Sequence, residues 1–254
     1  YQWKERAHAT VISAANKELL AKAQQQLDQR RYEVRTGKPA DIMFEANSAN
    51  PTKEALTKLN ELAERLKNNP SLMLEVNGHA DAREAAGKRD LSAERVNSIV
   101  AYLTAREVPA VQLETNSLGK TKQAASDNTE TGRRRNRRAS FTLYSSDLSV
   151  LAENLNAGNP LGVQISEKRF QKGENKAVDA VKWEKGTYNT ELNGRQYLVI
   201  VHDVLAPAPK QLHEVRGQVT ADYQNYLDEQ WVKQLQEKNP VSINQTEVEK
   251  IIKK

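Results

Sequence analysis

An acid and a base flank the polar stretch NGHADAREAAGKRDLSAERVNSIV, which runs from residue 77 to residue 100. Asp81 follows a predicted strand and Arg95 lies in the first turns of a predicted helix, so the two can lie close together in space. A carboxylate accepts hydrogen bonds from an ammonium, and a guanidinium binds a carboxylate through two parallel bonds. The pair therefore suits the head group of an amino acid. A surface ion pair, worth roughly 0–1 kcal/mol, is the other interpretation, and spacing alone leaves both open.

Six predicted elements position this pair between about residues 40 and 144. Alternation with period two marks strands, and apolar residues three and four apart mark helices. Pro51 suits the start of the first helix, and Asn69-Pro70 suits its end. The elements are strands at 41–45, 71–79, 113–119 and 134–144, and helices at 51–70 and 91–107. This βαβαββ order predicts an α+β sandwich of about 100 residues.

The flanking segments also show strand and helix patterns. Residues 6–15, RAHATVISAA, predict a strand, and Asn16 is the N-cap candidate of a helix that ends near residue 31. Residues 145–162 predict a linker with some helix. Two further strands and a long helix follow, at 162–170, 194–206 and 212–240.

Composition excludes several kinds of site. The chain has no cysteine, which excludes disulfides and thiolate metal sites. No metal-ligand cluster or nucleophile triad is evident, so we expect no metal, no cofactor and no catalytic residue. No apolar run approaches the roughly 18–20 residues of a membrane span, so we expect no direct membrane insertion. The chain begins without Met and without a signal-peptide pattern, which indicates a fragment or a processed form.

The charge balance points to anionic partners without choosing among them. The net charge is +5, which suits nucleic acid, anionic lipid or an acidic wall polymer. The basic run GRRRNRR, residues 132–138, has no interleaved aromatic residue before Phe141. Single-stranded nucleic acids bind on stacking aromatic side chains, so we expect no nucleic-acid partner.

Ordered motifs over about residues 40–144 resemble the OmpA-like peptidoglycan-binding family. MFEANSANPTKEALTKLNELAERLKNNP matches the opening F-x-x-N-S-A, helix and N-P of that family. VNGHAD matches G-H-T-D, with Ala80 where Thr is usual. LSAERVNSIVAYL matches L-S-x-x-R-A-x-x-V-x-x-Y-L, and NTETGRRRNRRASF matches N-x-x-x-G-R-x-x-N-R-R-V-x-F. The resemblance implies the fold of the family for this segment.

The resemblance also implies a site for diaminopimelate, the diamino acid of peptidoglycan stem peptides. Carried over, Asp81 would bind the ligand ammonium, Arg95 would bind its carboxylate, and Asn47 would be a neighbour. Departures from the family fall in one loop. The family has a Gly a few residues after the Asp, where this chain has AREAAGK, and Lys88 stands where Asn is usual. The Asp-to-Arg separation, 95 − 81 = 14, is one residue short.

The two flanks, once joined, resemble a parvulin domain, which implies a prolyl isomerase fold. ERAHATVISAANKELLAKAQQQLDQ resembles its first strand and helix, and EKRFQKGENKAVDAVKWEKGTYNTELNGRQYLVIVHDVL resembles the rest. The OmpA-like unit would then be inserted into this domain. Such an insertion is tolerated at a surface loop when the two ends of the inserted unit lie close together. The resemblance places Ala9 and Leu198 at the two active-centre histidines, with His8 one residue away. We therefore expect no isomerase activity, and an active isomerase is the alternative.

The tail from residue 206 resembles the C-terminal helix of SurA-like periplasmic chaperone-isomerases, particularly those of Bacteroidetes. Its apolar face would pack on a chaperone module or on the split domain, and the pattern leaves both open. The residues of that face are Val215, Val219, Tyr223, Tyr226 and Trp231.

These resemblances imply four parts. They are a first parvulin-like part at 1–38, an OmpA-like domain at 39–146, a linker with the second parvulin-like part at 147–208, and a C-terminal helix and tail at 209–254. The implied function is that of a non-catalytic periplasmic scaffold, also expected at the outer membrane. It would tether a SurA-like module, with unfolded or envelope proteins as clients, to peptidoglycan stem peptides. The alternative is an OmpA-like module repurposed for protein–protein interaction without wall binding.

Overall fold

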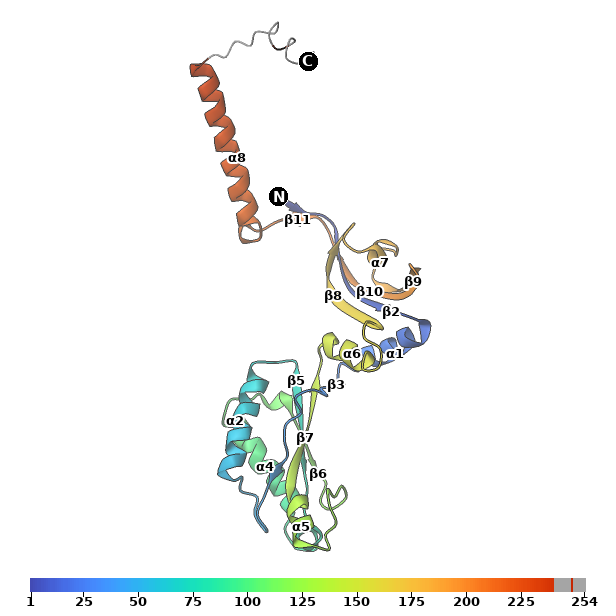
Figure 1. The fold of residues 1–254 in the computed structure, drawn as a ribbon, viewed down its shortest axis with the longest axis vertical. Coiled ribbons are helices and arrows are strands. Elements are labelled where there is room, and N and C mark those ends of the chain that lie inside the picture. Colours follow the sequence, from blue (N-terminus) through green and yellow to red (C-terminus); the bar gives the residue numbers. More distant parts are fainter. Residues whose placement is uncertain (240–247, 249–254) are drawn as a thin grey trace. The chain divides into compact units, whose positions relative to one another are not determined.

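The structure, a computed structural model, describes residues 1–239 and 248 (Figure 1). It divides into two compact units. The larger unit is Ala7–Asp203, and the smaller unit joins Tyr1–Arg6 to the described part of Val204–Lys254. The four parts predicted above are a finer division, which stays a prediction.

A mixed sheet, called here the central sheet, forms one half of the larger unit. The pairing of β5 with β7 is antiparallel, whereas β5 and β6 run parallel. In this register Leu74 lies opposite Leu143 and Val76 lies opposite Phe141, so these side chains share a face. In sheet order its strands are β3 (Tyr32–Glu33), β7 (Arg138–Ser145), β5 (Leu72–Gly78) and β6 (Leu113–Ser117), with β4 (Ile42–Met43) also paired to β7.

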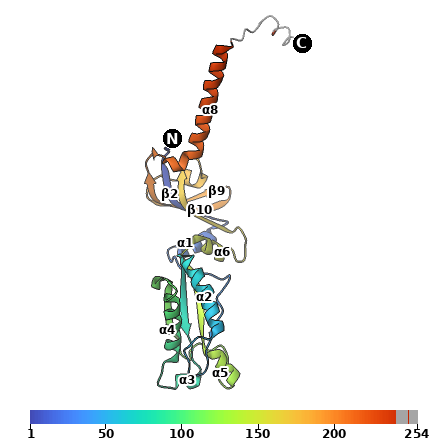
Figure 2. The same cartoon turned by 90° about the vertical axis from the view of Figure 1, so that its left-hand side faces the viewer.

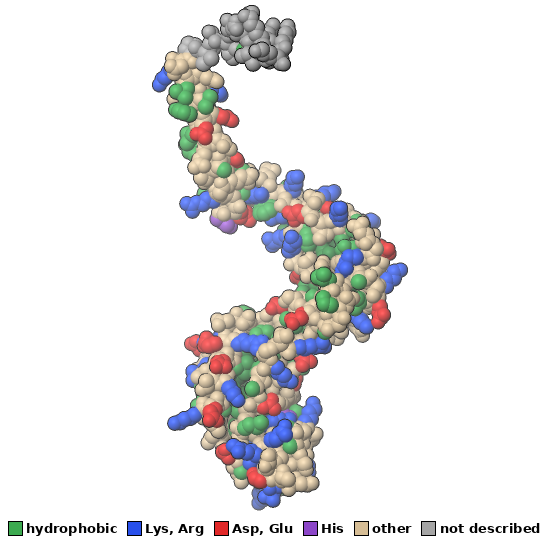
Figure 3. All heavy atoms as spheres, viewed as in Figure 1, with side chains coloured by type: hydrophobic (Ala, Val, Ile, Leu, Met, Phe, Trp, Pro, Cys, Tyr) green, Lys and Arg blue, Asp and Glu red, His purple; other side chains and the backbone are tan. Residues whose placement is uncertain are grey.

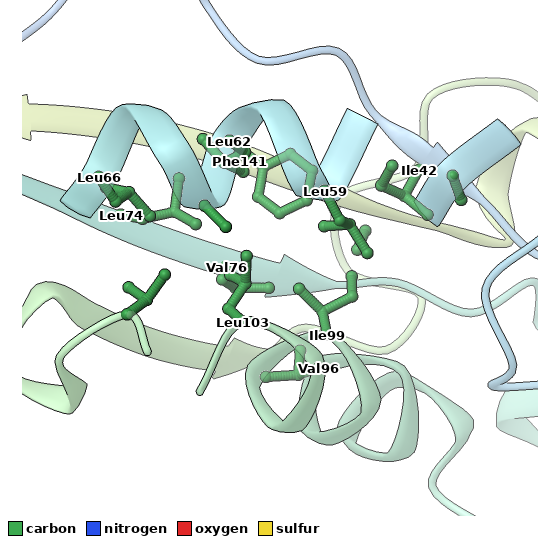
Figure 4. Close-up of a cluster of buried hydrophobic side chains, with 14 of the residues drawn as sticks. Ile42, Leu59, Leu62, Leu66, Leu74, Val76, Val96, Ile99, Leu103 and Phe141 are labelled. Atoms are coloured by element: carbon green, nitrogen blue, oxygen red, sulfur yellow. The ribbon is translucent and has the colours of Figure 1, made fainter. Parts of the chain in front are cut away.

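Two amphipathic helices, α2 (Lys53–Lys67) and α4 (Leu91–Thr104), cover one face of the central sheet (Figures 1 and 2). Thr52 caps α2 by accepting from the Ala55 N–H, and Asp90 caps α4 by accepting from the Ala93 N–H. The apolar stripes of both helices meet the sheet and leave water, which is the main driving force for this arrangement (Figure 4). The buried residues include Leu59, Leu62, Leu66, Val96, Ile99 and Leu103.

A second sheet is built from both flanks of the central segment. The strand β2 comes from before that segment, and its sheet neighbours β8 and β10 come from after it. The helices α1 (Lys17–Leu27) and α6 (Leu148–Leu155) contribute to its core, together with Ile12 and Leu198. In sheet order the strands are β8 (Val163–Gln171), β2 (Arg6–Ala14), β10 (Arg195–Leu205) and β9 (Gly186–Leu192), and α7 (Lys176–Asp179) lies between β8 and β9 in the chain.

The smaller unit pairs β1 (Gln2–Trp3) with β11 (Ala208–Pro209) and continues into α8 (Leu212–Lys238). Within this unit, the Trp3 indole N–H donates to Glu214 at 3.2 Å. Hydrophobic side chains are spaced along the described length of α8 (Figure 3). Of the face predicted above, Val215 is buried, whereas Tyr223, Tyr226 and Trp231 are exposed.

The predicted α+β class and the βαβαββ order of the central segment are confirmed. The short helices α3 (Ala82–Ala85) and α5 (Glu130–Asn136) were not predicted, and they replace a turn and the beginning of a strand. The 3-10 helix Ala110–Gln112 and α7 were not predicted either. The strand predicted from residue 134 begins at Arg138, because the Thr129 hydroxyl accepts from the Gly132 N–H and starts a helix before it. Among the described residues, no helix is long and apolar enough to cross a membrane.

Candidate functional site

A close approach of β5 to α4 places the two predicted site residues near each other. A Cβ at Gly78, the last residue of β5, would lie 2.1 Å from the Ser92 carbonyl oxygen and 2.6 Å from Val96 Cγ2. Only glycine permits this approach. The chain then runs through His79 to Asp81, beside the first turns of α4 that carry Arg95.

Asp81 is buried, with an exposed fraction of 2%, and its carboxylate accepts hydrogen bonds from other residues of the chain. It is the N-cap of α3, and Oδ1 accepts from the N–H groups of Arg83 and Glu84 at 2.9 and 3.0 Å. Oδ2 accepts from Arg137 Nη1 at 2.9 Å. Burial raises the pKa of Asp81, but the bonds from Glu84, Arg137 and Arg83 outweigh burial, so its pKa lies below the usual value.

Arg95 is fully buried, with an exposed fraction of 0%. Its guanidinium binds Glu84 through two bonds, Nη1 to Oε2 at 2.7 Å and Nη2 to Oε1 at 2.8 Å. The remaining bonds go to backbone carbonyls: Nε to Ser48 at 3.0 Å, Nη1 to His79 at 2.8 Å and Nη2 to Glu45 at 3.4 Å. A guanidinium has five N–H donors, and these contacts give each of them an acceptor.

Asn47 contributes to the same place through its backbone. The residue has φ +55°, a left-handed conformation that asparagine adopts more readily than most side chains. Its N–H donates to Glu84 Oε1 at 2.9 Å. The loop around it is held on α4, since the Ser98 hydroxyl donates to the Ala49 carbonyl at 2.6 Å.

The three predicted residues therefore converge on one point, the carboxylate of Glu84. The guanidinium of Arg95 and the N–H groups of Asn47 and Asp81, the last at 3.4 Å, all donate to it. We call these donors the carboxylate pocket. The described contacts include no bond between the side chains of Asp81 and Arg95. The pocket is filled by this chain, because the Glu84 side chain is only 3% exposed.

Glu84 itself was not predicted as a site residue. It completes a capping box with Asp81, in which each side chain bonds the backbone N–H of the other. The four-residue sequence DARE, residues 81–84, carries this signal, because an N-cap acid followed three residues later by Glu is the usual pattern. The same glutamate then extends to Arg95.

The basic run contributes ion pairs behind the pocket. Arg137 bridges Asp81 and Glu130, with Nη2 to Glu130 Oε1 at 2.9 Å. Arg133 also pairs with Glu130, at 2.9 Å, and Arg138 pairs with Asp41 at 3.1 Å. Most arginines of the basic run therefore hold the loops of the central segment in place.

A cleft of about 420 Å³ borders the other side of Glu84. Its lining includes Ala80, Glu84, Lys88, Arg89, Ser117 and Gly119. The loop that departs from the family motifs thus forms one wall of the cleft. This volume exceeds that of a single amino-acid side chain, so the pocket region has open space beside it.

The family comparison concerns this part of the chain. Residues 43–137 match the model of the OmpA family. The chain contains an OmpA-like domain. The match includes the loop of Asn47, the motif of Asp81, the helix of Arg95 and the basic run up to Arg137.

Solved structures similar to this chain come from several bacteria. The peptidoglycan-associated lipoprotein of Burkholderia pseudomallei is 27% identical over 41% of this chain and 89% of its own, with a TM-score of 0.38. The C-terminal domain of Helicobacter pylori MotB is 23% identical over 48% and 98%, with a TM-score of 0.40. The cell wall anchor of the type VI secretion system of Pseudomonas aeruginosa is 24% identical over 50% and 95%, with a TM-score of 0.36. No curated protein matches this chain.

The second sheet holds the positions that the parvulin resemblance assigns to histidines. Ala9 and Leu198 are both fully buried. A different pair of histidines, which sequence reasoning did not connect, lies on neighbouring strands: the rings of His8 and His202 are 5.1 Å apart. Thr10 Oγ1 lies 2.8 Å from His202 Nε2. Among the described residues, no group of three or more His, Asp or Glu side chains could hold a metal ion.

Proposed function

We propose that this chain is a non-catalytic binding and scaffold protein of the periplasm, whose OmpA-like domain binds the diaminopimelate of peptidoglycan stem peptides. The observation that carries the proposal is the carboxylate pocket. A buried guanidinium and two backbone N–H groups converge on a carboxylate within a domain that matches the OmpA family. Diaminopimelate carries a carboxylate and an ammonium at its side-chain end, and Arg95 supplies the two-bonded recognition that a carboxylate requires.

Asp81 would bind the ligand ammonium. Its Oδ2 atom accepts one bond, from Arg137, among the described contacts, and a carboxylate oxygen has two lone pairs. The lowered pKa of Asp81 keeps its carboxylate charged, as an ammonium partner requires. Asn47 would contribute its N–H to the ligand carboxylate.

The OmpA-like domain would attach the rest of the chain to peptidoglycan. We propose that the second sheet is a parvulin-like domain into which the OmpA-like domain is inserted. In support, its strand β2 precedes the OmpA-like domain in the chain and its other strands follow it. We propose that α8, with Tyr223, Tyr226 and Trp231 exposed, belongs to a SurA-like module that receives unfolded or envelope proteins. An outer-membrane location is part of the same proposal.

One observation favours the alternative function, a protein-interaction module without wall binding. Glu84 already occupies the guanidinium of Arg95, and a ligand carboxylate must displace this buried partner, with the cost of breaking its contacts. A ligand that binds Arg95 must offset this cost. The alternative therefore predicts that the pocket never opens to a stem peptide.

A calorimetric titration tests the proposal with two stem peptides that differ in one group. One contains diaminopimelate, and the other contains lysine, which lacks the side-chain carboxylate. We expect saturable binding of the diaminopimelate peptide only. Binding of neither peptide would support the alternative function, and equal binding of both would contradict recognition of the side-chain carboxylate. The pair of ligands is preferable to an Arg95→Ala control, because that variant leaves Glu84 buried without its partner.

A further inference from the structure

Glu84 has the contacts that a bound carboxylate ligand would have. Its two oxygens accept from both terminal nitrogens of Arg95 at 2.7 and 2.8 Å, and Oε1 also accepts from the Asn47 N–H at 2.9 Å. The left-handed backbone of Asn47 directs that N–H to the pocket. Glu84 is held on a helix of only four residues, which ends before Gly87.

We infer that Glu84 is a built-in occupant of the carboxylate pocket and the residue that sets how tightly the OmpA-like domain binds a carboxylate from outside. The inference rests on the proposed function for the identity of the outside ligand. Glu84 and a ligand carboxylate carry the same charge and need the same donors, so only one of them can bind Arg95 at a time.

This competition has a definite consequence for affinity. A tethered group acts at a high effective concentration, so it excludes a free carboxylate of the same chemistry. The apparent dissociation constant of a ligand rises in inverse proportion to the fraction of time that the pocket is free of Glu84. Ligands that also bind Asp81 through an ammonium gain a second contact, whereas a simple carboxylate does not. Glu84 weakens both kinds of ligand by the same factor, so only the zwitterionic ligand, with its second contact, keeps a measurable affinity.

An acetate experiment tests the occupancy directly. The variants are Glu84→Ala, Glu84→Gln and the matched control Glu94→Ala, whose glutamate lies on the exposed side of α4 and pairs with Arg89. The melting temperature of each full chain is measured with sodium acetate, with acetamide and with sodium chloride at equal concentration. We expect acetate alone to raise the melting temperature of Glu84→Ala, with a rise that continues with the logarithm of its concentration, and to leave the wild type and Glu94→Ala unchanged.

The same proteins are then titrated with the diaminopimelate and lysine stem peptides. We expect Glu84→Ala to bind the diaminopimelate peptide at least tenfold more tightly than the wild type, with Glu94→Ala equal to the wild type. If Glu84→Ala folds only in acetate, recovery in acetate but not chloride supports the inference. If it folds in neither, Glu84→Gln decides, since tighter binding than the wild type supports the inference and equal binding overturns it.

The outcomes separate the two proposals. If Glu84→Ala is folded and acetate does not raise its melting temperature, the inference is overturned. Equal affinity of wild type and Glu84→Ala for the diaminopimelate peptide also overturns it, and leaves the proposed function standing. Acetate binding by Glu84→Ala, with neither protein binding the stem peptide, supports the inference and overturns wall binding.

Discussion

At the scale of single residues, the OmpA-like domain depends on a buried charge. Arg95 is positive and has no access to water, so its charge is stabilised by Glu84 and by three backbone carbonyls. The Phe44 ring adds a contact, with its centroid 5.2 Å from the guanidinium carbon. Such a residue stabilises the fold only while each of its partners remains in place.

Arg95→Ala should lower the free energy of unfolding by about 3–5 kcal/mol, because it leaves the Glu84 carboxylate buried and unpaired. Urea unfolding of the variant measures this loss. The exposed Arg134 provides the control, and Arg134→Ala should change stability by less than about 0.5 kcal/mol. An Arg95→Ala loss as small as that of the control would contradict the buried ion pair.

His79 should make stability depend on pH. Burial, followed by the charges of Arg138 and Lys122, lowers the pKa of His79 to about 4. The unfolded chain binds a proton near pH 6.5 and the folded chain does not, so stability is complete above pH 6.5 and falls between pH 6.5 and pH 4. The loss is about 3 kcal/mol across this window.

His79→Gln should flatten this part of the pH profile, as measured by urea unfolding at each pH. The exposed His213 is the control, and His213→Gln should keep the profile of the wild type. Asp81, with its lowered pKa, loses its contribution only below its usual value of 3.8, so the two effects lie in separate windows. An unchanged slope in His79→Gln would show that another group titrates there.

The sequence could name the donors of the pocket but not their acceptor. Motif matches identified Asp81, Arg95 and Asn47, because these positions recur in ordered patterns. The contribution of Asn47 is made by its backbone, and that of Asp81 to the pocket is its N–H, which side-chain chemistry does not reveal. Glu84 was not predicted as a site residue, because its partner Arg95 lies 11 residues further along the chain.

At the scale of elements, the site depends on the approach of β5 to α4. The absence of a side chain at Gly78 lets the strand end lie against the first turn of the helix. This approach carries Asp81 and Arg95 to the same loop cluster. A change there alters the fold and the pocket together.

Gly78→Ala should destabilise the chain by about 1–3 kcal/mol and weaken stem-peptide binding, because its Cβ would meet the Ser92 carbonyl at 2.1 Å. Urea unfolding and the titration described above measure both effects. At Gly158 an added Cβ meets nothing within 4 Å, so Gly158→Ala is the matched control. Wild-type stability in Gly78→Ala would contradict the close approach.

The long elements were predictable and the short ones were not. The helices α2 and α4 show apolar periodicity over 15 and 14 residues, which is a strong local signal. By contrast, α3 and α5 have four and seven residues and depend on capping and ion pairs rather than on an apolar stripe. Helices this short are not stable by themselves, so they form only within the surrounding fold.

At the scale of the whole molecule, a chain segment on each side of the OmpA-like domain contributes to one sheet. The two flanks had to be read together for this sheet to be predicted, because β2 and β10 are nearly 200 residues apart in the chain, as the contact between Thr10 and His202 shows. Local periodicity carries no information on such a pairing.

We expect this chain not to accelerate proline isomerisation. Buried Ala9 and Leu198 stand where the parvulin resemblance expects histidines, and neither side chain can hydrogen-bond a substrate. A proline-isomerisation assay with a model peptide should give the uncatalysed rate. Acceleration that disappears in His8→Ala or His202→Ala would contradict this expectation and would assign the His8–His202 pair a role.

The central claim is that the OmpA-like domain recognises the side-chain carboxylate of diaminopimelate through Arg95. Its most direct test is the titration of Glu84→Ala, in which the internal competitor is absent, with the diaminopimelate and lysine stem peptides. The account predicts saturable binding of the diaminopimelate peptide and at least tenfold weaker binding of the lysine peptide. Equal affinities for the two peptides, or no binding of either by a folded variant, would contradict it.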